Sequence, residues 1–168
     1  MNPEDPWSAV HGGVRLHPDY VQGCSHLAAG DVTAAAACFE AADEQTAPND
    51  VYSSLYTAAR GYARVLLNDT SGLNLCRAAA RAEQHNGDVH EYLAKAELRL
   101  QHRKQACEAI VRGLRADRAH PGLRQLRRQM GIRRAPALGF LSRDNLLNRL
   151  IGRLTYQRGG GRSGPRKK

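Results

Sequence analysis

Two stretches of the chain share one spacing of small and large residues, and this spacing constrains the fold most strongly. The first is YVQGCSHLAAGDVTAAAACFEAADEQTAP, residues 20–48, and the second is YLAKAELRLQHRKQACEAIVRGLRADRAHP, residues 92–121. Each has the apolar periodicity of two helices joined by a short turn, and no stretch alternates like a strand. One such helix pair cannot bury its faces alone, so several pairs are expected to stack.

Start and stop signals divide most of the chain into about seven helices. Pro18 suits the first turn of a helix, and Asp31 is placed to cap the next one. Asn49 or Asp50 is the predicted N-cap of the third helix, and Gly131 is the predicted end of the last. Alanine is abundant, which favours helix and close helix contact. The sequence therefore predicts an all-α fold of helix pairs.

Both stretches resemble the tetratricopeptide repeat, a helix-turn-helix unit of about 34 residues. In the first stretch the resemblance rests on Gly23, Gly30, Asp31, Ala35, Phe39 and Ala42. In the second it rests on Leu93, Ala94, Ala106, Ile110 and Gly113. A degenerate unit between them is indicated by Leu55, Ala58, Ala59, Tyr62, Leu75, Ala79 and Ala82. The resemblance covers about residues 16–118 and implies a right-handed solenoid of three such units.

The open end of such a solenoid needs a cover. Leu123, Leu126 and Met130 follow the third unit at helical spacing and predict an end-cap helix. Beyond it, the Gly-rich basic end of the chain has the composition of a disordered segment. The expected parts are a flexible arm over 1–15, the solenoid with its cap over 16–131, a linker and amphipathic helix over 132–157, and a basic tail over 158–168.

The resemblance implies that the first helices of successive pairs line a concave groove that holds a peptide or a partner protein. The residues expected to face this groove are Tyr20, Tyr56, Arg60, Arg64, Glu91, Lys95 and Arg99. The cations would bind carboxylates of the partner, and the tyrosines would give apolar contact. The alternative is that these cations are ordinary solvated surface. A non-catalytic adaptor or scaffold is the predicted function.

Charge is distributed very unevenly along the chain. Residues 1–50 hold one basic and eight acidic residues, whereas residues 101–168 hold eighteen basic and three acidic ones. The second candidate function is therefore a nucleic-acid-associated protein that uses its basic C-terminal third. No aromatic residues interleave with these arginines, as they would in most single-strand binders. The candidate polyanion-binding residues are Arg124, Arg127, Arg128, Arg133 and Arg134.

Catalytic, metal-binding and targeting motifs are not apparent. The seven histidines form no recognised ligand set, so neither an enzyme nor a metal or other cofactor is predicted. The four cysteines, Cys24, Cys38, Cys76 and Cys107, are isolated and are expected to be small apolar residues within helices. No secretory signal and no membrane-spanning apolar run is seen, so a cytoplasmic protein is expected.

The segment SRDNLLNRLIGRL, which starts at Ser142, predicts an amphipathic helix. Its apolar face has three candidate partners. The helix would fold back onto the solenoid, bind another protein or a second copy through residues 146–154, or lie on an anionic membrane. The first alternative is favoured because the preceding linker is itself apolar, and membrane binding ranks third. The apolar face is formed by Leu146, Leu147, Leu150, Ile151 and Leu154.

Overall fold

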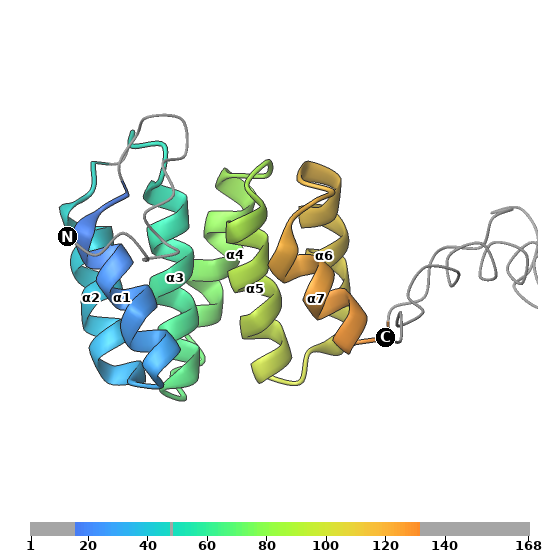
Figure 1. The fold of residues 1–168 in the computed structure, drawn as a ribbon, viewed down its shortest axis with the longest axis horizontal. Coiled ribbons are helices and arrows are strands. Elements are labelled where there is room, and N and C mark those ends of the chain that lie inside the picture. Colours follow the sequence, from blue (N-terminus) through green and yellow to red (C-terminus); the bar gives the residue numbers. More distant parts are fainter. Residues whose placement is uncertain (1–15, 48, 132–168) are drawn as a thin grey trace, which may run out of the picture. The chain divides into compact units, whose positions relative to one another are not determined.

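The computed structural model describes residues 16–47 and 49–131, and this part of the chain folds into seven α-helices without a strand (Figure 1). The all-α prediction is confirmed. None of these helices is both long and apolar enough to cross a membrane. The helices are α1 Pro18–Ala29, α2 Val32–Gln45, α3 Ser53–Leu66, α4 Gly72–Ala82, α5 Gly87–Arg99, α6 Arg103–Ala116 and α7 Pro121–Gln129.

The helices pack as pairs that stack in chain order. Within the pairs, α1 contacts α2, α3 contacts α4, and α5 contacts α6. Neighbouring pairs are joined because α2 packs on α3, and α5 packs on both α3 and α4. Helix α7 lies against α5 and α6 and closes the row (Figure 1). Each pair thus buries the face that it could not cover alone.

Local signals at the helix ends do what the sequence predicts. Pro18 occupies the first turn of α1. The Asp31 carboxylate accepts a hydrogen bond of 3.0 Å from the amide of Ala34 and so caps α2. Gly131 follows the end of α7 with a φ of 61°, a left-handed conformation that glycine adopts at low cost.

The start of α3 differs from the prediction. The helix begins at Ser53 with Tyr52 as its N-cap, a few residues later than Asn49 or Asp50 would place it. The Asp50 side chain instead accepts a hydrogen bond of 2.7 Å from the amide of Tyr52. Aspartate makes this local bond in turns as readily as in helix caps, and here the turn takes it.

Small residues allow close helix contact at two places in the core. A Cβ on Gly23 would lie 2.6 Å from the ring of Phe39, so only glycine lets α1 approach this fully buried side chain. A Cβ on Gly61 would lie 2.6 Å from the carbonyl oxygen of Gly72, where α3 meets the start of α4. The first contact follows the predicted small-to-large packing, and the second was not anticipated.

The cysteines are free, and two of them are buried in the core as small apolar side chains. The Cys76 thiol donates to the carbonyl oxygen of Ala58 at 3.3 Å, which links α4 to α3. Burial raises the pKa of this thiol to about 12, so it stays protonated near neutral pH. Cys38 and Cys107 are half-buried. Their predicted packing role therefore holds fully for Cys24 and Cys76 only.

The predicted end cap is confirmed by α7. Its Leu123 is fully buried and its Met130 nearly so, while Leu126 is half-buried. Arg103, at the start of α6, donates a hydrogen bond of 2.7 Å to the carbonyl oxygen of Met130 and holds the far end of α7. The predicted arm over 1–15, the linker and amphipathic helix over 132–157, and the basic tail over 158–168 lie outside the described residues.

Candidate functional site

The two tyrosines predicted to face a groove are core residues. Tyr20 is 5% exposed and Tyr56 is 2% exposed. Their ring centroids lie 5.1 Å apart, and the Tyr20 ring also lies 5.7 Å from that of Phe39. The structure corrects the prediction that these rings offer apolar contact to a partner, because they pack on each other instead.

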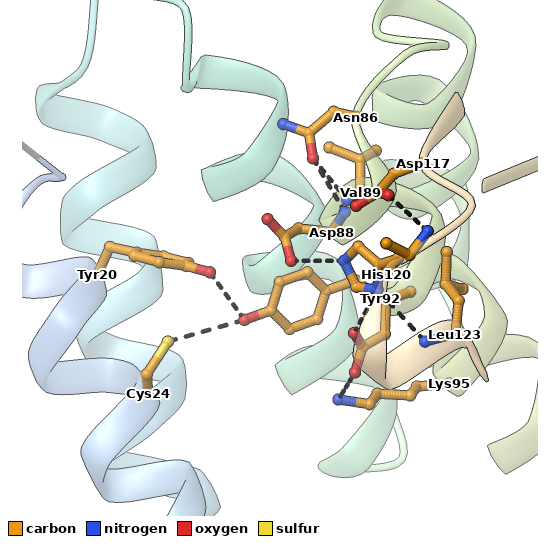
Figure 2. Close-up of polar contacts among 12 residues, drawn as sticks. Tyr20, Cys24, Asn86, Asp88, Val89, Tyr92, Lys95, Asp117, His120 and Leu123 are labelled. Atoms are coloured by element: carbon orange, nitrogen blue, oxygen red, sulfur yellow. Dashed lines mark hydrogen bonds and ion pairs between the residues drawn. The ribbon is translucent and has the colours of Figure 1, made fainter. Parts of the chain in front are cut away.

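Tyr92 of α5 closes the space between the first helices of the pairs. Its hydroxyl lies 3.1 Å from the hydroxyl of Tyr20 and 3.8 Å from the Cys24 sulfur, both on α1 (Figure 2). Burial raises the pKa of the Tyr92 hydroxyl, so it stays protonated. The helix between them, α3, carries fully buried alanines at Ala59 and Ala63. The chain's own aromatic side chains therefore occupy the part of the predicted groove that lies toward the N-terminal ends of α1, α3 and α5.

Two of the predicted cations are bound to carboxylates of the protein itself. Arg60 forms ion pairs with Glu40, with Asp43 at 3.1 Å and with Glu44 at 3.4 Å, all on α2. Arg64 likewise binds Asp69 at 2.7 Å in the turn after α3. Arg60 thus holds α3 to α2, so its charge is not free for a partner.

Glu91, another predicted site residue, belongs to a polar lock between α5 and α7. Its carboxylate lies 2.6 Å from the Lys95 ammonium and 3.6 Å from Nδ1 of His120. The other ring nitrogen, Nε2, donates to Asp88 at 2.9 Å, while Nδ1 accepts from the amide of Leu123 at 3.3 Å. The hydrogen bond to Asp88 raises the pKa of His120. Each group in this lock has a partner within the protein.

Three side chains of this lock are of types that bind metal ions, and they form the one such group that lies close together in the part of the chain that the structure describes. Asp88, Glu91 and His120 each offer one ligand atom, and these atoms lie within 4.8 Å of one another. However, the Lys95 ammonium is bound to Glu91, and both nitrogens of His120 make hydrogen bonds. A cation would have to displace these contacts, so the cluster is explained as an interhelix lock.

A shallow depression between α3 and α5 brings together the remaining two predicted cations, Lys95 and Arg99. Its volume is about 380 Å³. Arg99 is exposed, and no described residue pairs with its charge, whereas Lys95 is held by Glu91. The lining residues are Tyr62, Leu66, Lys95, Leu98, Arg99 and Gln101. This set, the α3–α5 depression, offers apolar surface beside an unpaired cation.

The apolar side of the depression was not predicted as a binding surface. Tyr62 and Leu66 are four residues apart on α3, so they share one helix face, as Lys95 and Arg99 do on α5. That spacing is a usable signal, but the resemblance assigns Tyr62 to the packing of the middle repeat. The structure leaves it half-exposed, with its pKa raised by partial burial.

Comparison with known proteins identifies the fold. No family model and no curated protein matches the sequence. Among solved structures, the chain is similar to the first tetratricopeptide domain of Spaghetti (RPAP3) bound to the HSP90 peptide SRMEEVD, with a TM-score of 0.50. It is also similar to the first such domain of human RPAP3, with a TM-score of 0.53. Each alignment covers 67% of this chain and 87% of the other at 16% identity. The tetratricopeptide-like solenoid that the sequence predicts is therefore the fold.

Proposed function

We propose that this chain is a non-catalytic protein-interaction module that binds an acidic segment of a partner protein in the α3–α5 depression. The observation that carries the proposal is Arg99, an exposed arginine without an ion-pair partner among the described residues. It stands beside the apolar side chains of Leu66 and Leu98. A carboxylate can bind this guanidinium while an adjacent apolar side chain covers the leucines.

The contrast with the other cations supports this choice of site. Arg60 and Arg64 are neutralised by carboxylates of the chain, and Lys95 is bound to Glu91. An arginine that has a free guanidinium can form a bidentate pair with a partner's carboxylate without first breaking an internal one. Arg99 is thus the predicted groove residue that is best placed to do so.

The aromatic side chains that occupy part of the predicted groove limit the size of the ligand that the site can hold. Because Tyr92 reaches across to Tyr20, a ligand has access to the depression at the C-terminal ends of α3 and α5 rather than to a full-length groove. A short segment with one or two carboxylates next to an apolar residue fits this description. The peptide in the Spaghetti domain, SRMEEVD, is of that kind, which supports the same class of ligand here.

A library of displayed peptides tests the proposal. Peptides selected on the full chain should be enriched in acidic residues beside apolar ones, and their binding should be lost in Arg99→Glu. Arg81→Glu is the matched control, because Arg81 is an exposed arginine on α4 outside the depression. Equal binding of the selected peptides to Arg99→Glu, or no selectable peptide at all, would contradict the proposal.

A further inference from the structure

We propose that the outer face of α7 binds the phosphate backbone of double-stranded nucleic acid. The face consists of two arginine–glutamine pairs one helical turn apart, and all four side chains are exposed. We call it the Arg/Gln face, and its residues are Arg124, Gln125, Arg128 and Gln129.

Positive charge at this end of the solenoid is not neutralised. Earlier in the solenoid, Arg60, Arg64 and Arg77 are each paired with a carboxylate, as Arg60 is with Asp43 and Arg77 is with Glu97 at 2.9 Å. Between 103 and 131 the sequence has only two acidic residues. No carboxylate of the described residues forms an ion pair with the cations Lys104, Arg112, Arg115, Arg118, Arg124, Arg127 and Arg128. Such a density of free positive charge attracts a polyanion.

The side chains of the Arg/Gln face have donors that suit phosphate oxygens. Arginine presents a planar fork of donors that matches two phosphate oxygens, which the ammonium of lysine does not. Arg124 and Arg128 are four residues apart, so their Cβ atoms lie about 5–6 Å from each other. Gln125 and Gln129 add amide donors beside them. Two cations and two amides on successive turns suit a row of phosphates along one strand.

The surroundings of the Arg/Gln face favour nucleic acid over the other anionic surfaces. Leu123 of α7 and Met130 at its C-cap are buried in the solenoid, Leu126 is half-buried, and none of the three belongs to the Arg/Gln face. The Arg/Gln face therefore lacks the apolar anchor on which protein interfaces and membrane-surface helices depend. Residues 103–131 also contain no tyrosine, phenylalanine or tryptophan on which an unpaired base could stack. These features favour the backbone of a duplex.

This surface corresponds to part of the polyanion site expected from the sequence. Arg124 and Arg128 are on the exposed face, whereas Arg127 is half-buried. Arg133 and Arg134 lie outside the described residues. The inference does not rest on the α3–α5 depression, because Arg99 is not part of the face and peptide binding can fail while duplex binding holds.

Fluorescence anisotropy with a labelled duplex DNA of about 20 base pairs, on the full chain, tests the proposal. The variant is Arg124→Gln/Arg128→Gln, which keeps the helix and its polar surface but removes two charges. It should weaken binding roughly tenfold near 0.1 M salt and make the slope of log K against log salt less steep by about 2. Circular dichroism should show unchanged melting, because neither arginine has an ion-pair partner among the described residues.

Controls separate this face from charge in general. Single variants Arg124→Gln and Arg128→Gln should each weaken duplex binding, whereas Arg81→Gln on α4 should not. Polyglutamate of matched charge should compete poorly, because carboxylates along a flexible chain lack the fixed spacing of phosphates. Equal loss in Arg81→Gln, full affinity in the double variant, or effective competition by polyglutamate would each overturn the proposal.

Discussion

Tyr20 and Tyr92 form the contact that most limits the access of a ligand to the predicted groove. Each hydroxyl is buried, and each is within hydrogen-bond distance of the other at 3.1 Å. Removing one of them leaves the other without this partner in an apolar environment, which costs more than the net gain from the bond. The pair therefore stabilises the fold only while it is complete.

Substitution of one hydroxyl should show this asymmetry. Tyr92→Phe should lower the free energy of unfolding by about 1–3 kcal/mol, because the Tyr20 hydroxyl then keeps only the weak thiol of Cys24 as a neighbour. Tyr20→Phe/Tyr92→Phe should recover part of that loss, since no buried hydroxyl is then left at the contact. Urea unfolding of the two single variants and the double variant gives the coupling. Additive losses would mean that the hydroxyls do not interact.

His120 joins α7 to α5 and should make stability depend on pH. Its folded pKa is raised, chiefly by the hydrogen bond to Asp88, with Asp88, Glu91 and Asp117 also contributing charge. A group whose pKa rises on folding binds protons more tightly in the folded state. Its stabilising contribution is complete below the unfolded pKa of about 6.5, and it is lost as the pH rises through the higher folded value.

The stability difference between the wild type and His120→Asn should therefore be larger at pH 5.5 than at pH 8. Asparagine is the matched replacement, because it can still cap α7 through its side-chain oxygen but does not titrate. Thermal melting of both proteins across this range measures the difference. A difference that grows with pH would show that the neutral ring, which accepts from the Leu123 amide, is the form that stabilises the lock.

At the scale of the helices, the sequence predicts what depends on neighbours in the chain. Asp31 caps α2, and Leu123 and Met130 form the buried side of α7, because both features follow from local spacing. The partners of Arg60 do not follow in this way. Its carboxylates lie 16 to 20 residues earlier on α2, and only the packing of α2 on α3 brings them together.

The groove prediction failed for the same reason at Tyr20 and Tyr56. A tyrosine on the first helix of a repeat faces either a ligand or a neighbouring side chain, and the sequence of one helix does not distinguish them. For Tyr20 the answer depends on Tyr92, which is 72 residues away, and for Tyr56 it depends on Tyr20. Lys95 and Arg99 do line a shared depression near the end of α5, although the Lys95 ammonium also lies 5.8 Å from the centroid of the Tyr92 ring.

Helix α7 should be essential to the fold, beyond covering its end. Leu123→Ala should destabilise the chain by about 2–5 kcal/mol, because Leu123 is fully buried against the last pair. Leu126→Ala, on the same helix but half-buried, should cost clearly less. Chemical unfolding of both variants measures this ratio. Equal losses would mean that the burial of Leu123 against α5 and α6 does not determine the effect.

For the molecule as a whole, the Tyr92 contact departs from simple nearest-neighbour stacking. In an ordinary repeat array each pair touches only its neighbours, so stability is close to a sum of local terms. Here the third pair reaches the first directly, because Tyr92 of α5 meets Tyr20 and Cys24 of α1. A substitution that weakens this contact on α5 should therefore lower the local stability of α1.

Hydrogen exchange can detect this long-range coupling. In Tyr92→Ala, amides of α1 should exchange roughly tenfold faster or more, since each 1.4 kcal/mol of lost opening free energy corresponds to a factor of ten. Leu98→Ala is the control, because Leu98 is also on α5 but lines the α3–α5 depression instead of meeting α1. It should speed exchange near α5 and leave α1 protected. If α1 responds equally to both variants, the whole solenoid opens as one unit and the Tyr92 contact has no special role in joining its ends.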